Sequence, residues 1–207
     1  MSQQQPIQQF LDDLASSAAT PGGGGAAALS GAMGAALVSM VCNLTIGRKK
    51  YAEVEPQMKE LLEQAEELRT QLTALIADDV AAFNSVMDAY RLPKATDEEK
   101  SARSAAIQTA SKQATIVPLQ AAQACAKVIE LARPAAEKGN SNVVSDVGAA
   151  VAAAQSGLKA SALNVMINLG TIKDETFVTE HRDKLDQIIE ASEPLAQEVY
   201  EFVKSKF

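Results

Sequence analysis

Hydrophobic positions recur with helical spacing along most of the chain. Segments 6–17, 54–90 and 174–207 each show one apolar face and one polar face, the pattern of helices that lie on a protein surface. Two further segments, 25–46 and 142–169, are apolar nearly all round. This pattern predicts amphipathic helices packed around two buried helices.

A long helical pattern also covers residues 97–137. Thr96 or Asp97 can cap its start, and acidic residues in the first turn suit the positive end of a helix dipole. Pro118 is expected to kink or restart this helix. No stretch alternates with period two for long. We therefore predict an all-α fold, a bundle of about six or seven helices in one domain that spans residues 1–207.

The ends of the other helices carry their own signals. Gly47 is expected to end the helix at 25–46, because glycine readily takes the left-handed conformation found after a helix. Asn142 or Ser141 can cap the helix that follows residue 140, and Asp174 can cap the last helix.

Amino-acid composition and net charge indicate which classes of protein the chain can belong to. Of the 207 residues, 47% are hydrophobic but only 4% are aromatic, and Ala dominates, which favours close-packed helices over a β-sandwich. The net charge of −7 argues against nucleic-acid binding, which needs a basic face. Residues 22–47 carry no charge, but they are rich in Ala and Gly and include polar residues. We interpret them as a buried central helix rather than a membrane span.

The two cysteines and the N-terminal sequence indicate the cellular compartment of the protein. Cys42 and Cys125 lie far apart in apolar helical runs, which is typical of buried free thiols in a reducing compartment. The first residues show no basic region followed by an apolar core, so we expect no signal peptide and a cytoplasmic protein. One His and two distant Cys argue against a metal site.

Two helices rich in Ala and Gly have more apolar surface than one small domain is expected to bury. The segments 25–46 and 142–169 carry few charges, and a chain of 207 residues has limited surface with which to enclose both. We therefore expect extra burial across a subunit interface, and predict a homodimer.

The sequence Thr-Pro-Gly-Gly-Gly-Gly at residues 20–25 stands out before the first apolar helix. Such a turn offers free backbone N–H groups and the positive end of a dipole to an anion. It also suits a tight turn that lets two helices approach closely. It is not a phosphate-binding loop, because no Gly-Lys-Ser/Thr follows.

Candidate chemistry is limited to polar residues on otherwise apolar helices, since the single His181 excludes a Ser-His-Asp triad elsewhere. A buried carboxylate without a partner is costly, so each buried Asp must pair, be protonated or face a cleft. Phe83 lies four residues after Asp79 and so on the same helix face. The candidates are Asn43, Asp79, Asp146, Asn164 and Asn168.

Each candidate also has a structural interpretation. Asp146 can be a favourable charge at a helix N-terminus. Asn164 and Asn168, four residues apart, can be buried hydrogen-bonding groups between helices. Phe83 can be a core residue rather than a platform for ring stacking.

The ordered set of motifs resembles the cyclodeaminase/cyclohydrolase family of folate enzymes over nearly the whole chain. The chain looks most like the stand-alone methenyltetrahydrofolate cyclohydrolases of this family, and we expect no transferase domain of the kind to which the cyclodeaminases are often fused. The motifs are Pro21, Gly22, Gly23 and Gly24 before an Ala-rich helix; Asn43 and Arg48 at its far end; Asp79 with Phe83; Lys94 after Leu92-Pro93; Asn140 after Gly139; Asp146 after Ser145; and Asn164 with Asn168.

The resemblance implies an all-helical homodimer that hydrolyses 5,10-methenyltetrahydrofolate to 10-formyltetrahydrofolate. Because the reacting carbon of this cation is already electrophilic, no metal or cofactor is expected. Asp79 and Asp146 are the candidates for the base and for a contact with the pterin amino edge, and their assignment stays open.

Other residues would bind the folate. Asn43, Asn164 and Asn168 would orient water or the pterin, and Phe83 would stack on the pterin. Arg48, Lys94 or the N–H groups of the glycine turn would hold the carboxylates of the folate tail.

Two alternatives remain open from the sequence. One is a formiminotetrahydrofolate cyclodeaminase, an ammonia-lyase with much the same pocket. The other is a helical interaction module without enzyme activity, in which the Gly/Ala-rich helices only pack a dimer.

Overall fold

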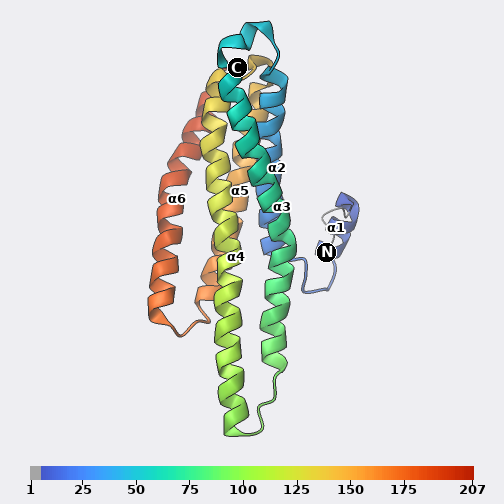
Figure 1. The fold of residues 1–207 in the computed structure, drawn as a ribbon, viewed down its shortest axis with the longest axis vertical. Helices are drawn as coiled ribbons and strands as arrows, with labels where there is room; N and C mark the ends of the chain where they lie inside the picture. Colours follow the sequence, from blue (N-terminus) through green and yellow to red (C-terminus); the bar gives the residue numbers. More distant parts are fainter. Residues whose placement is uncertain (1–5) are drawn as a thin grey trace.

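The computed structural model describes residues 6–207, and over this range the chain forms six α-helices and two short 3-10 turns, with no strand. Figure 1 shows α2 to α6 aligned in one elongated bundle, while α1 stands to one side. The prediction of an all-α fold is confirmed. The bounds are α1 Ile7–Leu14, α2 Gly23–Thr45, η1 Lys49–Val54, α3 Glu55–Arg91, α4 Asp97–Lys138, η2 Ser141–Val143, α5 Val144–Leu169 and α6 Glu175–Lys204.

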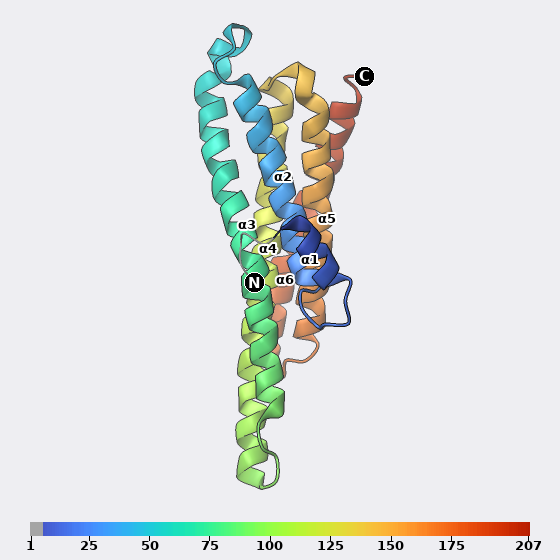
Figure 2. The ribbon, with the colours of Figure 1, turned by 90° about the vertical axis from the view of Figure 1, so that its right-hand side faces the viewer.

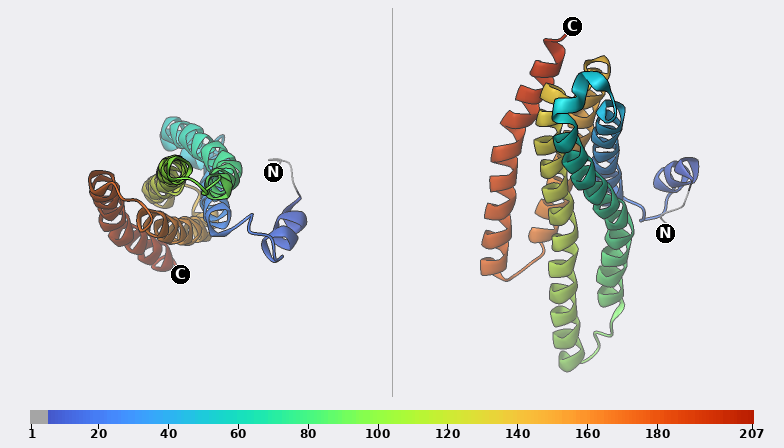
Figure 3. Two further views of the ribbon diagram at one scale, coloured as in Figure 1. Left: turned by 90° about the horizontal axis from the view of Figure 1, so that it is seen from below. Right: turned by 45° about the horizontal axis from the view of Figure 1, so that its top comes forward.

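Helix α2 occupies the centre of one side of the bundle, where it contacts α3, α4 and α5. On the other side, α4 and α5 both contact α6 (Figure 3). Helices α3 and α4, with 37 and 42 residues, are the longest. Figure 2 shows that they continue together beyond the start of α2 and the end of α5. We call this two-helix projection, which ends in the loop 92–96, the α3–α4 tip.

Helix α2 is long and apolar enough to cross a membrane by length and composition, with a mean hydropathy of 1.7 in its most apolar window. However, 61% of that window is buried inside the protein. Both features are those of the core helix of a bundle, so the structure agrees with the interpretation of this segment as a buried central helix.

Glycines let α2 approach α5 with no side chain between the two backbones. A side chain at Gly157 of α5 would come within 2.8 Å of both the Ala27 carbonyl and the Cys125 sulfur. One at Gly34 of α2 would come within 2.9 Å of the Ala150 carbonyl. Close helix contact of this kind requires residues without a Cβ at these positions.

The two cysteines are free and buried, as the sequence predicts. Burial raises the pKa of the Cys42 thiol to about 11 and that of the Cys125 thiol to about 12. Both therefore remain protonated near neutral pH and act as small apolar side chains in the core.

The prediction that Pro118 would restart its helix is wrong, because α4 runs without interruption from Asp97 to Lys138. The alternative, a kink at Pro118, stays a prediction. A proline has no N–H group, so the carbonyl of Ala114, four residues earlier, loses its helical donor. The side-chain amide of Asn168 on α5 donates to this carbonyl at 2.7 Å. The interhelical hydrogen bond expected for Asn168 is thus confirmed, and its partner is the acceptor that Pro118 leaves free.

The predicted caps are confirmed at two helices and wrong at one. Thr96 and Glu99 form a capping box at the start of α4, and Asp174 accepts a hydrogen bond from the N–H of Phe177 at the start of α6. Neither Asn142 nor Ser141 caps α5. The side chain of Asn140 instead accepts from the N–H of Asn142 and so caps the turn η2. The capping residue is therefore Asn140 rather than Ser141 or Asn142, because the 3-10 turn η2 lies between it and α5.

Asn168→Ala is expected to lower the free energy of unfolding by roughly 1–3 kcal/mol, since it leaves a buried carbonyl without a donor. In a Pro118→Ala background the N–H of residue 118 is restored, so the same change should cost less, with a coupling of at least about 0.5 kcal/mol. Urea denaturation of the four proteins at one concentration measures this coupling. Asn164→Ala is the matched control, because its amide bonds within α5 and should show no coupling to residue 118.

Candidate functional site

The glycine turn lies where α2 begins, against both α3 and α5. Gly22 is the N-cap in an extended conformation, with φ −125°, and α2 starts at Gly23. The N-cap residue Gly22 has no side chain with which to cap this helix end. Its first N–H groups, at the positive end of the helix dipole, are therefore offered to whatever lies beside the turn.

The group beside the turn is the carboxylate of Asp79 on α3. A Cβ atom at Gly24 would overlap this carboxylate, so the close approach of α3 requires glycine at this position. The backbone N–H of Gly25 donates a hydrogen bond to Asp79. The glycine turn thus lets two helices approach closely, and the anion that it faces belongs to the chain itself. Binding of a ligand anion by this turn stays a prediction.

Asp79 is half-buried, and this burial destabilises the charged form of its carboxyl. Desolvation by burial raises the pKa of this carboxyl, and the hydrogen bond from Gly25 lowers it by less. The adjacent Asp78 is exposed. A carboxyl with a raised pKa, held at a helix N-terminus, is a stronger base than an ordinary surface Asp.

Asn164 of α5 forms the opposite wall of the turn. Its side-chain nitrogen and oxygen lie 3.6 and 3.8 Å from where a Cβ atom of Gly23 would stand. The amide nitrogen donates to the Ala160 carbonyl at 2.8 Å, within its own helix, so the interhelical bond predicted for Asn164 is wrong. Its oxygen has no partner among the described residues and can accept a hydrogen bond from a ligand.

Phe83 lies one helical turn beyond Asp79, toward the α3–α4 tip. It keeps 36% of its surface exposed, so it is not the core residue of the alternative interpretation. An exposed ring next to a half-buried carboxylate offers a flat apolar surface to a ligand. We name these residues together the turn-side group: Pro21, Gly22, Gly23, Gly24, Asp79, Phe83 and Asn164.

Four predicted site residues lie at the other end of α2. Asn43 is in the last turns of α2, and Asp146 is half-buried in the first turn of α5. Asn43 follows Gly24 by nineteen positions, which corresponds to about 29 Å along the helix. Within one chain, the structure therefore does not bring them to Asp79. We name this set the far group: Asn43, Arg48, Asn140 and Asp146.

Asn140 has a clear structural role at this end of the bundle. Its side chain donates to the Leu44 carbonyl at 3.0 Å, and its N–H donates to the Thr45 hydroxyl at 2.9 Å. Tyr51 joins the network, because its hydroxyl lies 3.4 Å from the Asn140 oxygen and accepts from the N–H of Ser141 at 3.0 Å. Hydrogen bonds to Ser141 lower the pKa of Tyr51 to about 8. Sequence reasoning missed Tyr51, since 89 positions separate it from Asn140.

Lys94 lies at neither group but in the loop of the α3–α4 tip, where it lines a groove with the turn between α5 and α6. Over residues 6–207, no three His, Cys, Asp or Glu side chains are grouped so that they could hold a metal ion.

Comparison with known proteins places these features in a family. A family model described as Formiminotransferase-cyclodeaminase matches residues 6–187. The chain is 57% identical over 206 residues to a methenyltetrahydrofolate cyclohydrolase of Methylorubrum extorquens, and the match covers 100% of this chain and 99% of that protein. It is 32% identical to the formimidoyltransferase-cyclodeaminase of Sus scrofa, of which the match covers only 37%.

The fold is shared with a solved structure as well. The formiminotetrahydrofolate cyclodeaminase from Thermotoga maritima superposes with a TM-score of 0.84 at 32% sequence identity, covering 98% of this chain and 96% of that one. At this identity and coverage, the whole bundle is common to the two proteins.

Asp79→Asn is expected to raise the midpoint of thermal unfolding at neutral pH, because it removes a charge that burial penalises in the folded state. The folded pKa is raised, so the penalty is present above that pKa and disappears as the pH falls below the ordinary Asp value. The gain should therefore shrink toward acidic pH. Calorimetry across the pH range measures it, with the exposed Asp78→Asn as control. Destabilisation by Asp79→Asn at neutral pH would contradict this account.

Proposed function

The chain belongs to the formiminotransferase-cyclodeaminase family, and we propose that it catalyses the hydrolysis of 5,10-methenyltetrahydrofolate to 10-formyltetrahydrofolate, a reversible step of one-carbon metabolism. The full-length similarity to a cyclohydrolase supports this reaction. The structural observation that carries the proposal is the half-buried Asp79 carboxylate held against the glycine turn.

The reaction needs a base next to a cation. In the substrate, one carbon bridges N5 and N10 and carries an amidinium charge. The oxygen of water bonds to this carbon while a carboxylate accepts a water proton. The bond from the carbon to N5 then breaks, this proton passes to N5, and the carbon remains on N10 as a formyl group after the second water proton leaves.

Asp79 is our candidate for that carboxylate. Its raised pKa makes it a better proton acceptor than an exposed Asp, and its negative charge would stabilise the cationic substrate nearby. The amide of Asn164 would orient the attacking water or the pterin, and the exposed ring of Phe83 would stack on the pterin. The carbon is electrophilic without help, so the proposed reaction uses no metal or cofactor.

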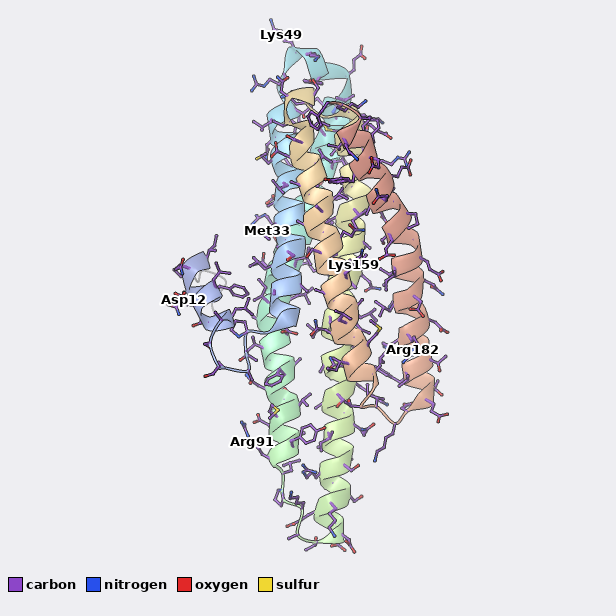
Figure 4. The ribbon with its side chains drawn as sticks, turned by 180° about the vertical axis from the view of Figure 1, so that it is seen from behind. Asp12, Met33, Lys49, Arg91, Lys159 and Arg182 are labelled. Carbon is purple, nitrogen blue, oxygen red and sulfur yellow. The ribbon has the colours of Figure 1, made fainter. Side chains whose placement is uncertain are left out.

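A homodimer would explain the exposed apolar surface of α2 and α5. Figure 4 looks onto these two helices, with Met33 on the outer side of α2. Met33 is 49% exposed, and Leu163 and Ile167 of α5 are 65% and 70% exposed. Apolar side chains gathered on two neighbouring helices favour burial against a second copy.

The dimer would also give the far group a place in the site. If the two-fold axis crosses α2 near its middle, the two α2 helices pair antiparallel. Each glycine turn then lies beside the far group of the partner subunit. We propose that Asp146 of the partner subunit approaches the folate at the turn-side group, together with Asn43, Arg48 and Asn140 of the partner subunit.

The proposed compartment is the cytoplasm. Two free, buried thiols are typical of a protein in a reducing compartment. Folate-dependent one-carbon chemistry is consistent with this location.

The second candidate function is that of a cyclodeaminase, which closes the same bridge from 5-formiminotetrahydrofolate and releases ammonia. It is favoured by the likeness to the Thermotoga maritima enzyme. Ammonia release from 5-formiminotetrahydrofolate at a rate above that of methenyltetrahydrofolate hydrolysis would establish it instead. Absence of both activities and of folate binding would leave the interaction module.

Asp79→Asn is expected to lower kcat/KM by at least ~10²-fold, because the amide keeps the shape but cannot accept the proton. The assay follows the loss of methenyltetrahydrofolate absorbance above the spontaneous rate. Asp78→Asn, one residue away and exposed, is the matched control and should retain normal turnover. Near-normal turnover of Asp79→Asn would transfer the role of base to Asp146.

Mixed dimers test the composite site. Asp79→Asn and Asp146→Asn should each be nearly inactive alone, while coexpression should restore about a quarter of wild-type activity, because half the dimers are mixed and each has one intact site. Asp79→Asn coexpressed with Phe83→Ala is the control and should restore none, since both changes affect the same group. Mixed dimers that are detected by mass but stay inactive would refute the shared site.

A further inference from the structure

Tyr51 joins the three segments that carry the far group, although neither the sequence motifs nor the proposed function uses it. It lies in η1, three residues after Arg48, and its own N–H donates to the Arg48 carbonyl at 2.8 Å. Its hydroxyl contacts Asn140 and Ser141, which lie just before α5. Asn140 in turn is hydrogen-bonded to the last turn of α2.

Every member of the far group lies on or close to this network. Asn43 precedes Leu44, whose carbonyl accepts from the Asn140 side chain at 3.0 Å. Asp146 follows Ser141 by five residues and lies in the first turn of α5, into which η2 leads. Loss of the tyrosine hydroxyl would therefore loosen the start of α5 against the end of α2, and the Asp146 carboxylate with it.

The Tyr51 hydroxyl both donates and accepts in this network. It accepts a hydrogen bond from the N–H of Ser141 at 3.0 Å, and it donates to the Asn140 side-chain oxygen at 3.4 Å. Its oxygen also lies 3.2 Å from the Ser141 hydroxyl. The bond to Asn140 needs the phenol proton, because the Asn140 oxygen can only accept. An ionised Tyr51 would thus release Asn140.

Ionisation of this hydroxyl falls within the pH range of an enzyme assay. Hydrogen bonds from the side chain and the N–H of Ser141 lower the pKa of Tyr51 to about 8, and desolvation opposes them by less. Among the described residues, Lys50 is the charged group that acts on Tyr51. Its ammonium lies 5.1 Å from the centre of the ring and favours the ionised form. Asn140 and Ser141, which lie against the hydroxyl, carry no charge.

We propose that Tyr51 is a positioning residue of the hydrolase: it holds the far group together, and with it the Asp146 carboxylate that each subunit would bring to the turn-side group of the other. The inference rests on the proposed function and on its shared site. Because Tyr51 acts on geometry rather than on the reacting atoms, its loss should lower kcat more than it changes KM. The hold on Asn140 requires the phenol form, so activity should fall as Tyr51 ionises.

The ionisation can be followed directly, because the chain has three tyrosines and no tryptophan. Tyrosinate absorbance of the wild-type protein should show one group that ionises near pH 8. This step should be missing in Tyr51→Phe and kept in Tyr200→Phe, the matched control on α6. In Ser141→Ala, which removes one of the hydrogen bonds that favour ionisation, the step should move to higher pH.

The same proteins are then assayed for methenyltetrahydrofolate hydrolysis, above the spontaneous rate at each pH. Wild-type kcat should fall above about pH 8. In Ser141→Ala this fall should move to higher pH by the same amount as the tyrosinate step. Tyr51→Phe should have kcat about tenfold lower at neutral pH and show no alkaline fall. Tyr200→Phe should match the wild type.

A merely structural role for Tyr51 predicts a different result, in which Tyr51→Phe loses thermal stability but keeps the wild-type pH profile. That result, or a Tyr51→Phe protein with wild-type kcat, would refute the proposal while leaving the hydrolase intact. The Ser141→Ala comparison keeps the tyrosine hydroxyl, so it decides the question even where Tyr51→Phe fails to fold. An alkaline fall of kcat that does not follow the tyrosinate step would count against the positioning role. No turnover by the wild-type protein at any pH would refute the proposed function, and this role with it.

Discussion

Direct contact between the backbones of α2 and α5 is the constraint on which the rest of the structure depends. Gly34 and Gly157 allow it, because any side chain there would meet a carbonyl of the other helix. The contact fixes the height of α2 in the bundle, and so the place where its N-terminus meets α3. The glycine turn continues the same principle at Gly24, where the neighbour is the carboxylate of Asp79 rather than a backbone.

This packing creates a carboxylate that costs stability. Burial disfavours the charge on Asp79, and the hydrogen bond from Gly25 offsets only part of that cost. A fold selected for stability alone would place a neutral residue here, whereas a base for proton transfer must be able to hold a charge and be close to a ligand. The small residues of α2 thus have two consequences, a tight core and a poised functional group.

The length of α3 gives the candidate site an extended face. Helices α3 and α4 run past the start of α2, so one face of α3 carries Asp79 and, one helical turn farther on, Phe83. Near the opposite end of α2, Asn140 and Tyr51 form a hydrogen-bonded cluster. A dimer would place this cluster beside the face of α3 that carries Asp79.

The sequence by itself determined the helices, their caps at Thr96 and Asp174, the buried thiols and the family, because these depend on spacing and on residue types close together in the chain. Only the tertiary structure decided which polar residues meet. It placed Asp79 against Gly24 and paired Asn168 with the carbonyl that Pro118 leaves free. It also separated Asp146 from Asp79 by most of the length of α2. Contacts between distant segments depend on helix register and height, and these follow from how complete helices pack rather than from any local pattern.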